Sequence, residues 1–122
     1  MKQTRKEGNY IIKENYYNNG HKWYEYWYKD GKLDRKDGPA VQHWYENGQK
    51  WYNNGQKEHE AWYKDGKLDR KDGPAVQHWY VNGQKSFEYW YLNGKEISER
   101  EFVLLNRKRK LGKRKLGKLV II

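Results

Sequence analysis

The chain has no cysteine and only two prolines among its 122 residues. The absence of cysteine excludes disulfides, thiolate metal sites and thiol nucleophiles. Long apolar runs are missing too. The N-terminus, MKQTRKEGNYIIKENYY, has no signal-peptide core, and no segment reaches the ~20 apolar residues that span a membrane. We therefore expect a soluble, cytoplasmic protein.

Aliphatic side chains are scarce in the middle of the chain. Residues 16–95 contain only six residues of the Ile, Leu, Val or Met type, against 19 aromatic residues. A core there must be built from indole and phenol rings, which bury roughly 150–250 Å² each and carry a polar tip. This aromatic content argues against disorder, because disordered segments are poor in aromatic residues.

Acidic residues are absent from the C-terminal end. Residues 107–118 hold eight basic residues, and the rest of the chain carries a net charge of only +2, from 26 − 8 − 16. Nucleic acid, an anionic membrane and an acidic protein surface are all suitable partners, and a solvated tail without a partner is the simpler alternative. The anion-binding residues predicted in this tail are Arg107, Lys108, Arg109, Lys110, Lys113, Arg114 and Lys115.

The dominant feature that is present is an internal repeat. Residues 27–50 read WYKDGKLDRKDGPAVQHWYENGQK, and residues 62–85 repeat them with one change, Glu46 against Val81. Such self-similarity is typical of repeat proteins in one elongated domain.

Turn signals divide the repeats into short strands. Asn-Gly and Asp-Gly pairs between alternating segments favour hairpins, because a type I′ turn needs positive φ at both central residues. The seven predicted turns are at residues 19–20, 30–31, 47–48, 54–55, 65–66, 82–83 and 93–94, and Asp-Gly-Pro at 37–39 and 72–74 adds two more bends. We predict an all-β fold, an elongated single antiparallel sheet of tandem β-hairpin repeats with a short C-terminal capping helix.

The chain is predicted to have four parts. Residues 1–15 form an N-terminal edge segment, and residues 16–97 form the hairpin repeat domain. Residues 98–108 form the capping helix, because Ser98 and Glu101 fit a capping box and Phe102, Leu105 and Arg109 share one stripe. Residues 109–122 form a flexible basic tail, because its glycines disfavour a long helix.

The motifs resemble a known family. Asn-Gly-x-Lys followed by Trp-Tyr-x-Asn/Asp-Gly-Lys is similar to the MORN-type repeat, in the antitoxin-like variant of the YwqK type. The Asp-Gly-Pro-Ala units are similar to those of uncharacterised phage and giant-virus repeat proteins. The resemblance covers roughly residues 17–102 and implies successive hairpins in one long sheet. It also implies binding and neutralising a partner protein, in the host cytoplasm if the chain is viral. Asp34 and Asp69 stand where the viral relatives commonly have His, which puts a shared His-dependent role in doubt.

The tryptophans are the candidate partner-binding residues. Trp27, Trp62 and Trp90 are expected to stack along one face, with Trp44 and Trp79 interleaved, either as the core or as a recognition surface. A one-layer sheet cannot bury both faces. The repeated Arg35 and Arg70 lie beside these rings in the sequence, and Trp, Tyr and Arg dominate interfaces.

Catalysis and metal binding are not expected. His43 and His78 are explained by duplication, and no triad, phosphate loop or dinucleotide motif is present. Asp34, Asp37, Asp69 and Asp72 suggest Ca²⁺, but turn capping explains them more simply. No cofactor is predicted.

The prediction from sequence is a non-enzymatic binding protein that inhibits a partner protein. One alternative is a nucleic-acid or nucleotide binder that uses stacking and Arg/Lys. Another is an anionic membrane-surface scaffold. Self-association through the apolar end, Leu119 to Ile122, is a further alternative.

Overall fold

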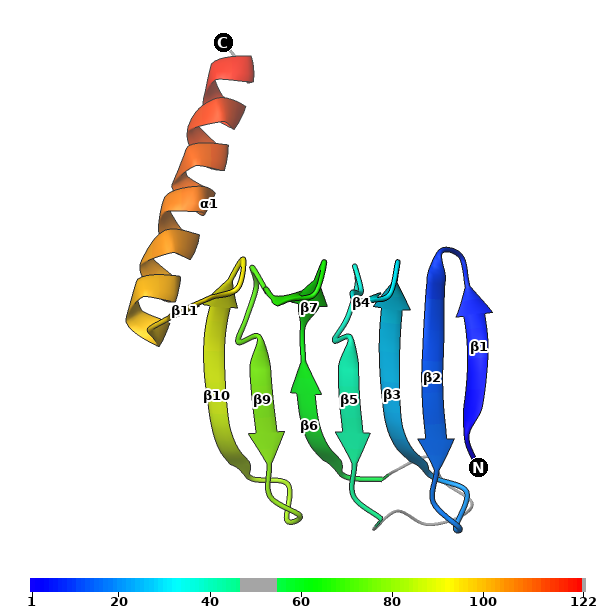
Figure 1. Ribbon diagram of the computed structural model, residues 1–122. Coiled ribbons are helices and arrows are strands. Elements are labelled where there is room, and N and C mark those ends of the chain that lie inside the picture. Colours follow the sequence, from blue (N-terminus) through cyan, green and yellow to red (C-terminus); the bar gives the residue numbers. More distant parts are fainter. Residues whose placement is uncertain (47–54, 122) are drawn as a thin grey trace.

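The structure is a single open sheet with one helix at its end. The computed structural model describes the backbone of residues 1–46 and 55–121, and side chains in those ranges as far as residue 112. The strands lie side by side in one layer, and the helix rises from the far end (Figure 1). The predicted all-β architecture is confirmed: one large, open antiparallel sheet of hairpins.

Strand order in the sheet follows chain order almost without exception. The sheet runs β1-β2-β3-β5-β6-β9-β10-β11, β4 pairs with β3, and β7 and β8 pair separately. The strands are β1 (Gln3–Glu7), β2 (Tyr10–Tyr16), β3 (Lys22–Lys29), β4 (Lys32–Leu33), β5 (Val41–Trp44), β6 (Lys57–Ala61), β7 (Tyr63–Lys64), β8 (Lys67–Leu68), β9 (Val76–Trp79), β10 (Lys85–Leu92) and β11 (Lys95–Ile97).

The hairpin turns follow the sequence signals in two different ways. Asp30-Gly31, Asp65-Gly66 and Asn93-Gly94 have positive φ at both residues, as a type I′ turn requires. At Gly20 and Gly83 only the glycine has positive φ, and in each case its N–H bonds the carbonyl three residues back. The predicted turns at 47–48 and 54–55 involve residues 47–54, which lie outside the described residues.

The N-terminal segment forms more structure than expected. It was predicted only as an edge segment over residues 1–15. Instead β1 and β2 form a complete hairpin around Gly8, which has a φ of 60°, and β2 pairs with β3 in the body of the sheet. The short strand β1 is therefore the sheet edge, and its Lys and Arg side chains discourage further pairing.

The helix α1 (Glu99–Ile121) begins as predicted and ends later. The Glu101 N–H donates to Ser98 Oγ at 3.1 Å, which is the expected cap. The predicted end at Lys108 and the flexible tail beyond it were wrong, because the helix continues through Gly112 and Gly117. Each glycine costs only about 1 kcal/mol, and the Lys, Arg and Leu residues around them are good helix formers. Among the described residues, no helix is long and apolar enough to cross a membrane.

The small apolar core sits at one end of the strands, where the Asp-Gly-Pro loops fold over. Ile12, Trp27 and Ala40 are buried together, and Tyr10, Leu33 and Tyr63 pack around them. The same end carries the tips of β3–β4, β7–β8 and β10–β11, which lie along the upper edge of Figure 1. We call this end the loop edge, comprising residues 28–40, 62–75 and 91–95.

Candidate functional site

Cross-strand register gives the sheet two chemically different faces. On one face, a row of carboxylates and amides crosses six strands, each residue directly opposite the next. The row is Glu14, Glu25, Gln42, Glu60, Gln77 and Glu88. We call this the carboxylate–amide face. The opposite face carries a parallel row of rings, described below as the ring face.

Each copy of the repeat builds the same unit from a tryptophan, an arginine and a glycine. The Arg35 guanidinium lies 4.0 Å from the centroid of the Trp27 ring and donates to the Pro39 carbonyl at 3.2 Å. The copy, Arg70, lies 4.0 Å from Trp62 and donates to the Pro74 carbonyl at 3.1 Å. A guanidinium over an aromatic face is attracted by the ring quadrupole.

The glycine of each loop makes room for that guanidinium. A Cβ at Gly38 would lie 2.9 Å from Arg35 Cζ, and one at Gly73 would lie 2.9 Å from Arg70 Cζ. Real Cβ atoms do not approach that closely. The Asp-Gly-Pro loop thus packs directly on the arginine, which packs on the indole, and both arginines are engaged within their own repeats.

The predicted tryptophan ladder is not present among the described residues, where no ring contact joins two tryptophans. Trp27 is only 7% exposed and meets Tyr10 edge-on at 5.3 Å. Trp90 faces Phe102 of α1 at 6.5 Å, and Lys57 lies 6.0 Å from Trp44. Trp79 accepts a hydrogen bond from Tyr45 at its carbonyl. Strand alternation brings these rings to one face, but charged side chains separate them.

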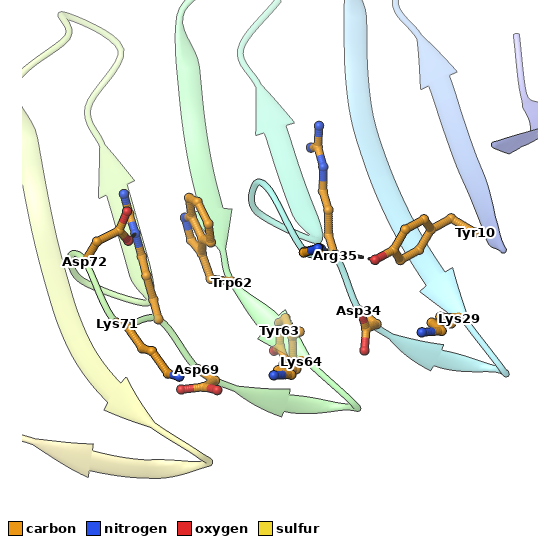
Figure 2. A pocket seen from close by; sticks show the side chains of 12 residues that line it. Tyr10, Lys29, Asp34, Arg35, Trp62, Tyr63, Lys64, Asp69, Lys71 and Asp72 are labelled. Atoms are coloured by element: carbon orange, nitrogen blue, oxygen red, sulfur yellow. Dashed lines mark hydrogen bonds and ion pairs between the residues drawn. The ribbon is translucent and has the colours of Figure 1, made fainter. Parts of the chain in front are cut away.

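Between the repeats the loop edge is hollowed into pockets. Two of them measure about 520 Å³ each; one lies between the first and second repeats, and Figure 2 shows Trp62, Arg35 and Tyr10 around it. A further pocket of about 440 Å³ lies beside it, toward β1. Neighbouring pockets share lining residues, so together they form one basic groove along the loop edge.

The aspartates of this edge join successive repeats. Asp34 Oδ2 accepts the Asp65 N–H at 2.7 Å, and Asp69 Oδ1 accepts the Asn93 N–H at 3.0 Å. Each carboxylate therefore caps the turn of the next repeat, whereas a cap on its own turn was expected. Asp34 and Asp69 therefore have a structural role at the junctions between repeats, for which a carboxylate is suited.

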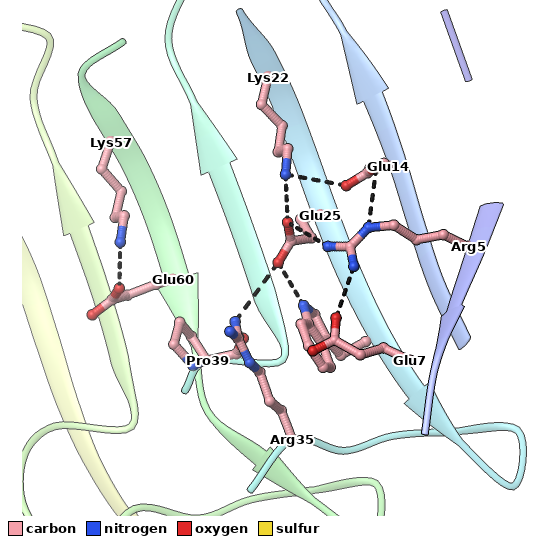
Figure 3. A network of polar contacts seen from close by, with 10 residues as sticks. Arg5, Glu7, Glu14, Lys22, Glu25, Arg35, Pro39, Lys57 and Glu60 are labelled. Carbon is pink, nitrogen blue, oxygen red and sulfur yellow. Dashed lines mark hydrogen bonds and ion pairs between the residues drawn. The ribbon is translucent and has the colours of Figure 1, made fainter. Parts of the chain in front are cut away.

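Ion pairs stabilise the carboxylate–amide face, most densely near the N-terminus (Figure 3). Lys22, Lys57 and Lys85 each pair with the glutamate three residues later, at 2.7, 3.0 and 2.8 Å. Glu25 is buried and also receives the indole N–H of Trp27. Burial raises the pKa of Glu25, but hydrogen bonds from Lys22 and Trp27, with the charges of Lys22 and Arg35, outweigh it and hold that pKa below its usual value.

The ring face carries a row of neighbouring aromatic rings. The sequence analysis predicted such a row for the tryptophans, but other residues form it. Tyr24, His43, His59, His78 and Phe87 lie on five successive strands, each opposite the next in register. Their ring centroids are 6.1, 6.2, 6.0 and 5.0 Å apart in that order. These rings are half-buried, and Tyr89 in the next row is exposed.

Two histidines of this row have a pKa below the usual value. Burial lowers the pKa of His43, with the charge of Glu58 opposing it. Burial also lowers the pKa of His59, and the neighbouring His43 and His78 lower it further. Tyr26 Oη lies 2.7 Å from His43 Nε2, within hydrogen-bonding distance. At neutral pH His43 and His59 are therefore largely uncharged.

The positions of these residues in the repeats could have predicted the row from the sequence. Tyr24, His59 and Phe87 occupy equivalent positions of the three Asn-Gly-x-Lys segments, and His43 and His78 occupy equivalent positions of the other unit. Placing the two units side by side in antiparallel register interleaves these positions. The prediction favoured the tryptophans because of their large indole rings, and these lie on the other face.

The basic tail residues lie on α1. Arg109 reaches back to the sheet, donating to the Lys71 carbonyl at 3.0 Å and to the side chain of Asn106. Arg107, Lys108 and Lys110 are exposed. Lys113, Arg114 and Lys115 continue the helix backbone. Of the predicted apolar stripe, Phe102 is buried on Trp90, whereas Leu105 is exposed.

Comparison with known protein families, curated proteins and solved structures found no match. The resemblance to MORN-type repeats therefore remains a prediction from the motifs.

Proposed function

We propose that this chain is a non-enzymatic recognition protein that binds, and thereby inhibits, a partner protein through the ring face of its sheet. The observation that carries the proposal is the uninterrupted strip of rings on that face. Both the Asp-Gly-Pro loops, through Arg35 on Trp27, and the helix, through Phe102 on Trp90, pack on the opposite face.

The chemistry of the ring face suits a protein interface. Its rings have few rotatable bonds and combine apolar faces with polar tips, which favours interface hot spots. Three neighbouring strands place Val41, Ala61 and Val76 in the row beside the rings. The ring face therefore combines imidazole rings with apolar side chains at its centre and has charged residues such as Lys13 beyond its edge, and a charged rim is common in interfaces.

The test compares two exposed tyrosines. Tyr89 lies on the ring face and is 45% exposed, while Tyr80 is 53% exposed at the start of the turn after β9. A partner is captured from nuclease-treated host lysate, identified and purified, and its affinity for Tyr89→Ala, Tyr80→Ala and the unchanged chain is measured by calorimetry. We expect Tyr89→Ala to weaken binding by about 30-fold or more, as loss of a hot spot does, and Tyr80→Ala to leave it unchanged.

The salt dependence of binding and a truncation of the chain distinguish an aromatic interface from binding by the basic end of α1. An aromatic interface should lose little affinity between 50 and 200 mM salt, roughly the range over which phosphate-driven binding falls steeply. A partner that is unaffected by Tyr89→Ala but lost on removing residues 107–122 would refute the proposal, because the basic end of α1 would then carry the binding.

A further inference from the structure

The groove along the loop edge has a charge that its own residues do not neutralise. The pocket between the first two repeats is lined by six cationic and three acidic side chains. Each acid is already engaged: Asp34 and Asp69 cap turns, and Asp72 pairs with Arg70 at 2.8 Å. The excess of positive charge therefore faces the pocket.

Four of the cations have no acidic partner. No carboxylate among the described residues lies within ion-pair distance of the amines of Lys29, Lys36, Lys64 or Lys71. Lys29 and Lys64 are equivalent positions of the repeat, as are Lys36 and Lys71. Unpaired ammonium groups thus recur at the repeat spacing along one groove.

Aromatic rings lie between these amines. Tyr10, Trp62 and Tyr63 line the same pocket (Figure 2). Trp62 differs here from its copy Trp27, which Tyr10 covers edge-on. Trp62 has an arginine on its ring but no aromatic neighbour within contact distance among the described residues.

The groove continues beyond this pocket toward the helix. Lys64 and Lys71 also line the next pocket, together with Lys67 and Arg109. Arg109 is fixed there by its bond to the Lys71 carbonyl, so the basic surface of α1 begins where the groove ends. A groove of this kind, with regularly spaced cations, fits a linear ligand with regularly spaced anions.

We propose that the loop-edge groove binds single-stranded nucleic acid, with phosphates on Lys29, Lys36, Lys64 and Lys71 and bases against Trp62 and Tyr63. Cationic grooves with interleaved rings bind single strands through phosphate attraction and base stacking. An acidic peptide would satisfy the lysines but would leave the rings unused. This site goes beyond the proposed function, because it lies on another surface and binds another class of ligand.

The test uses the full chain and 20-nucleotide fluorescein-labelled strands, dT20 and U20, in anisotropy titrations between 50 and 200 mM NaCl. The groove variant is Lys29→Gln, Lys36→Gln, Lys64→Gln and Lys71→Gln together. The matched control carries the same change at Lys2, Lys6, Lys13 and Lys95, which lie outside the groove. Circular dichroism verifies that both variants are folded.

We expect the groove variant to bind at least tenfold more weakly at 100 mM salt, while the control changes little. Four lost phosphate contacts should also reduce the slope of log affinity against log salt by about 3, at roughly 0.7 per contact. Such behaviour with either dT20 or U20 supports the site, and failure to bind both overturns it. Equal losses in the two variants would also overturn it, because net charge would then suffice.

Two further probes separate base stacking from charge alone. An abasic 20-mer has the same phosphates without bases, and should bind at least fivefold more weakly if the rings stack on bases. A 20-base-pair duplex keeps its bases stacked internally and should bind more weakly than either single strand. Equal affinity for the abasic strand or for the duplex overturns the proposal. Tyr89→Ala, which tests the ring face, should leave all these affinities unchanged.

Discussion

Replacing Gly73 with alanine tests how the repeat unit is held together. The added Cβ would lie 2.9 Å from Arg70 Cζ, so the guanidinium must move. The Arg70 side chain is flexible, and the penalty is therefore the set of contacts that it gives up. These are the stack on Trp62, the bond to the Pro74 carbonyl and the pair with Asp72.

The magnitude follows from those contacts. A partly exposed cation–π contact is worth about 0.5–1 kcal/mol. A charge-assisted hydrogen bond is worth about 1–1.5 kcal/mol at a partly exposed site. The pair with Asp72 adds little, because that carboxylate is 74% exposed. We expect Gly73→Ala to lower the free energy of unfolding by about 2 kcal/mol, and the Tm by roughly 5–10 °C for a chain of this size.

The assay is urea unfolding followed by tryptophan fluorescence, with a double-mutant cycle. In an Arg70→Met background no guanidinium meets the new methyl group, so Gly73→Ala should then cost less than about 0.7 kcal/mol. An equal cost in both backgrounds would refute the reasoning, because the damage would then lie in the loop backbone and not in the arginine. Gly38→Ala should show the same difference in cost between the unchanged chain and an Arg35→Met background.

Three other changes have outcomes that the structure predicts. Acidification from pH 7.5 to 5 should destabilise the fold: the pKa of His43 and of His59 lies below the free value of 6.5, so as the pH falls through 6.5 the unfolded chain binds protons that the folded chain does not. His59→Gln should flatten this dependence in urea titrations at pH 5, 6 and 7.5, and greater stability in acid would contradict it. Asp69→Ala should lower the free energy of unfolding by about 1 kcal/mol, since it removes the acceptor of the Asn93 N–H, whereas Asp72→Ala should change it by less than about 0.5 kcal/mol. Gly112→Ala meets no atom within 4 Å and should raise the helical dichroism at 222 nm, stabilising α1 by about 0.5–1 kcal/mol, and unchanged dichroism would count against a continuous α1.

The local signals predicted the strand architecture well. Asp30-Gly31 and its copies specify tight turns by their own φ values, and Ser98 with Glu101 specifies the helix start. Such features depend on a few neighbouring residues, so they can be read without the rest of the fold. The N-terminal hairpin was missed because its turn, Gly8-Asn9, does not carry the Asn-Gly order.

The candidate site depends on information that is not local. Which rings meet is decided by register between residues 9 to 19 positions apart, as in His78 with Phe87 and Tyr24 with His43. Which face stays open is decided by where the Asp-Gly-Pro loops fold. Neither is visible in the repeat itself, because indole and phenol rings alternate along strands such as β3 and β10, and either kind of ring can form a core.

The Asp-Gly-Pro loops fold onto the tryptophan face because an arginine of each loop covers the indole ring there. The arginine replaces the aliphatic side chains that the repeats lack. A guanidinium can lie flat on an indole and still bond a loop carbonyl, so Arg35 and Arg70 cover Trp27 and Trp62 with a charged group that remains hydrated at its edge. Among the described residues, the ring row Tyr24, His43, His59, His78 and Phe87 has no arginine stacked on it. The duplication that copied the Trp–Arg–Gly unit therefore also copied positions of the ring row, and each added repeat extends both the sheet and its ring face.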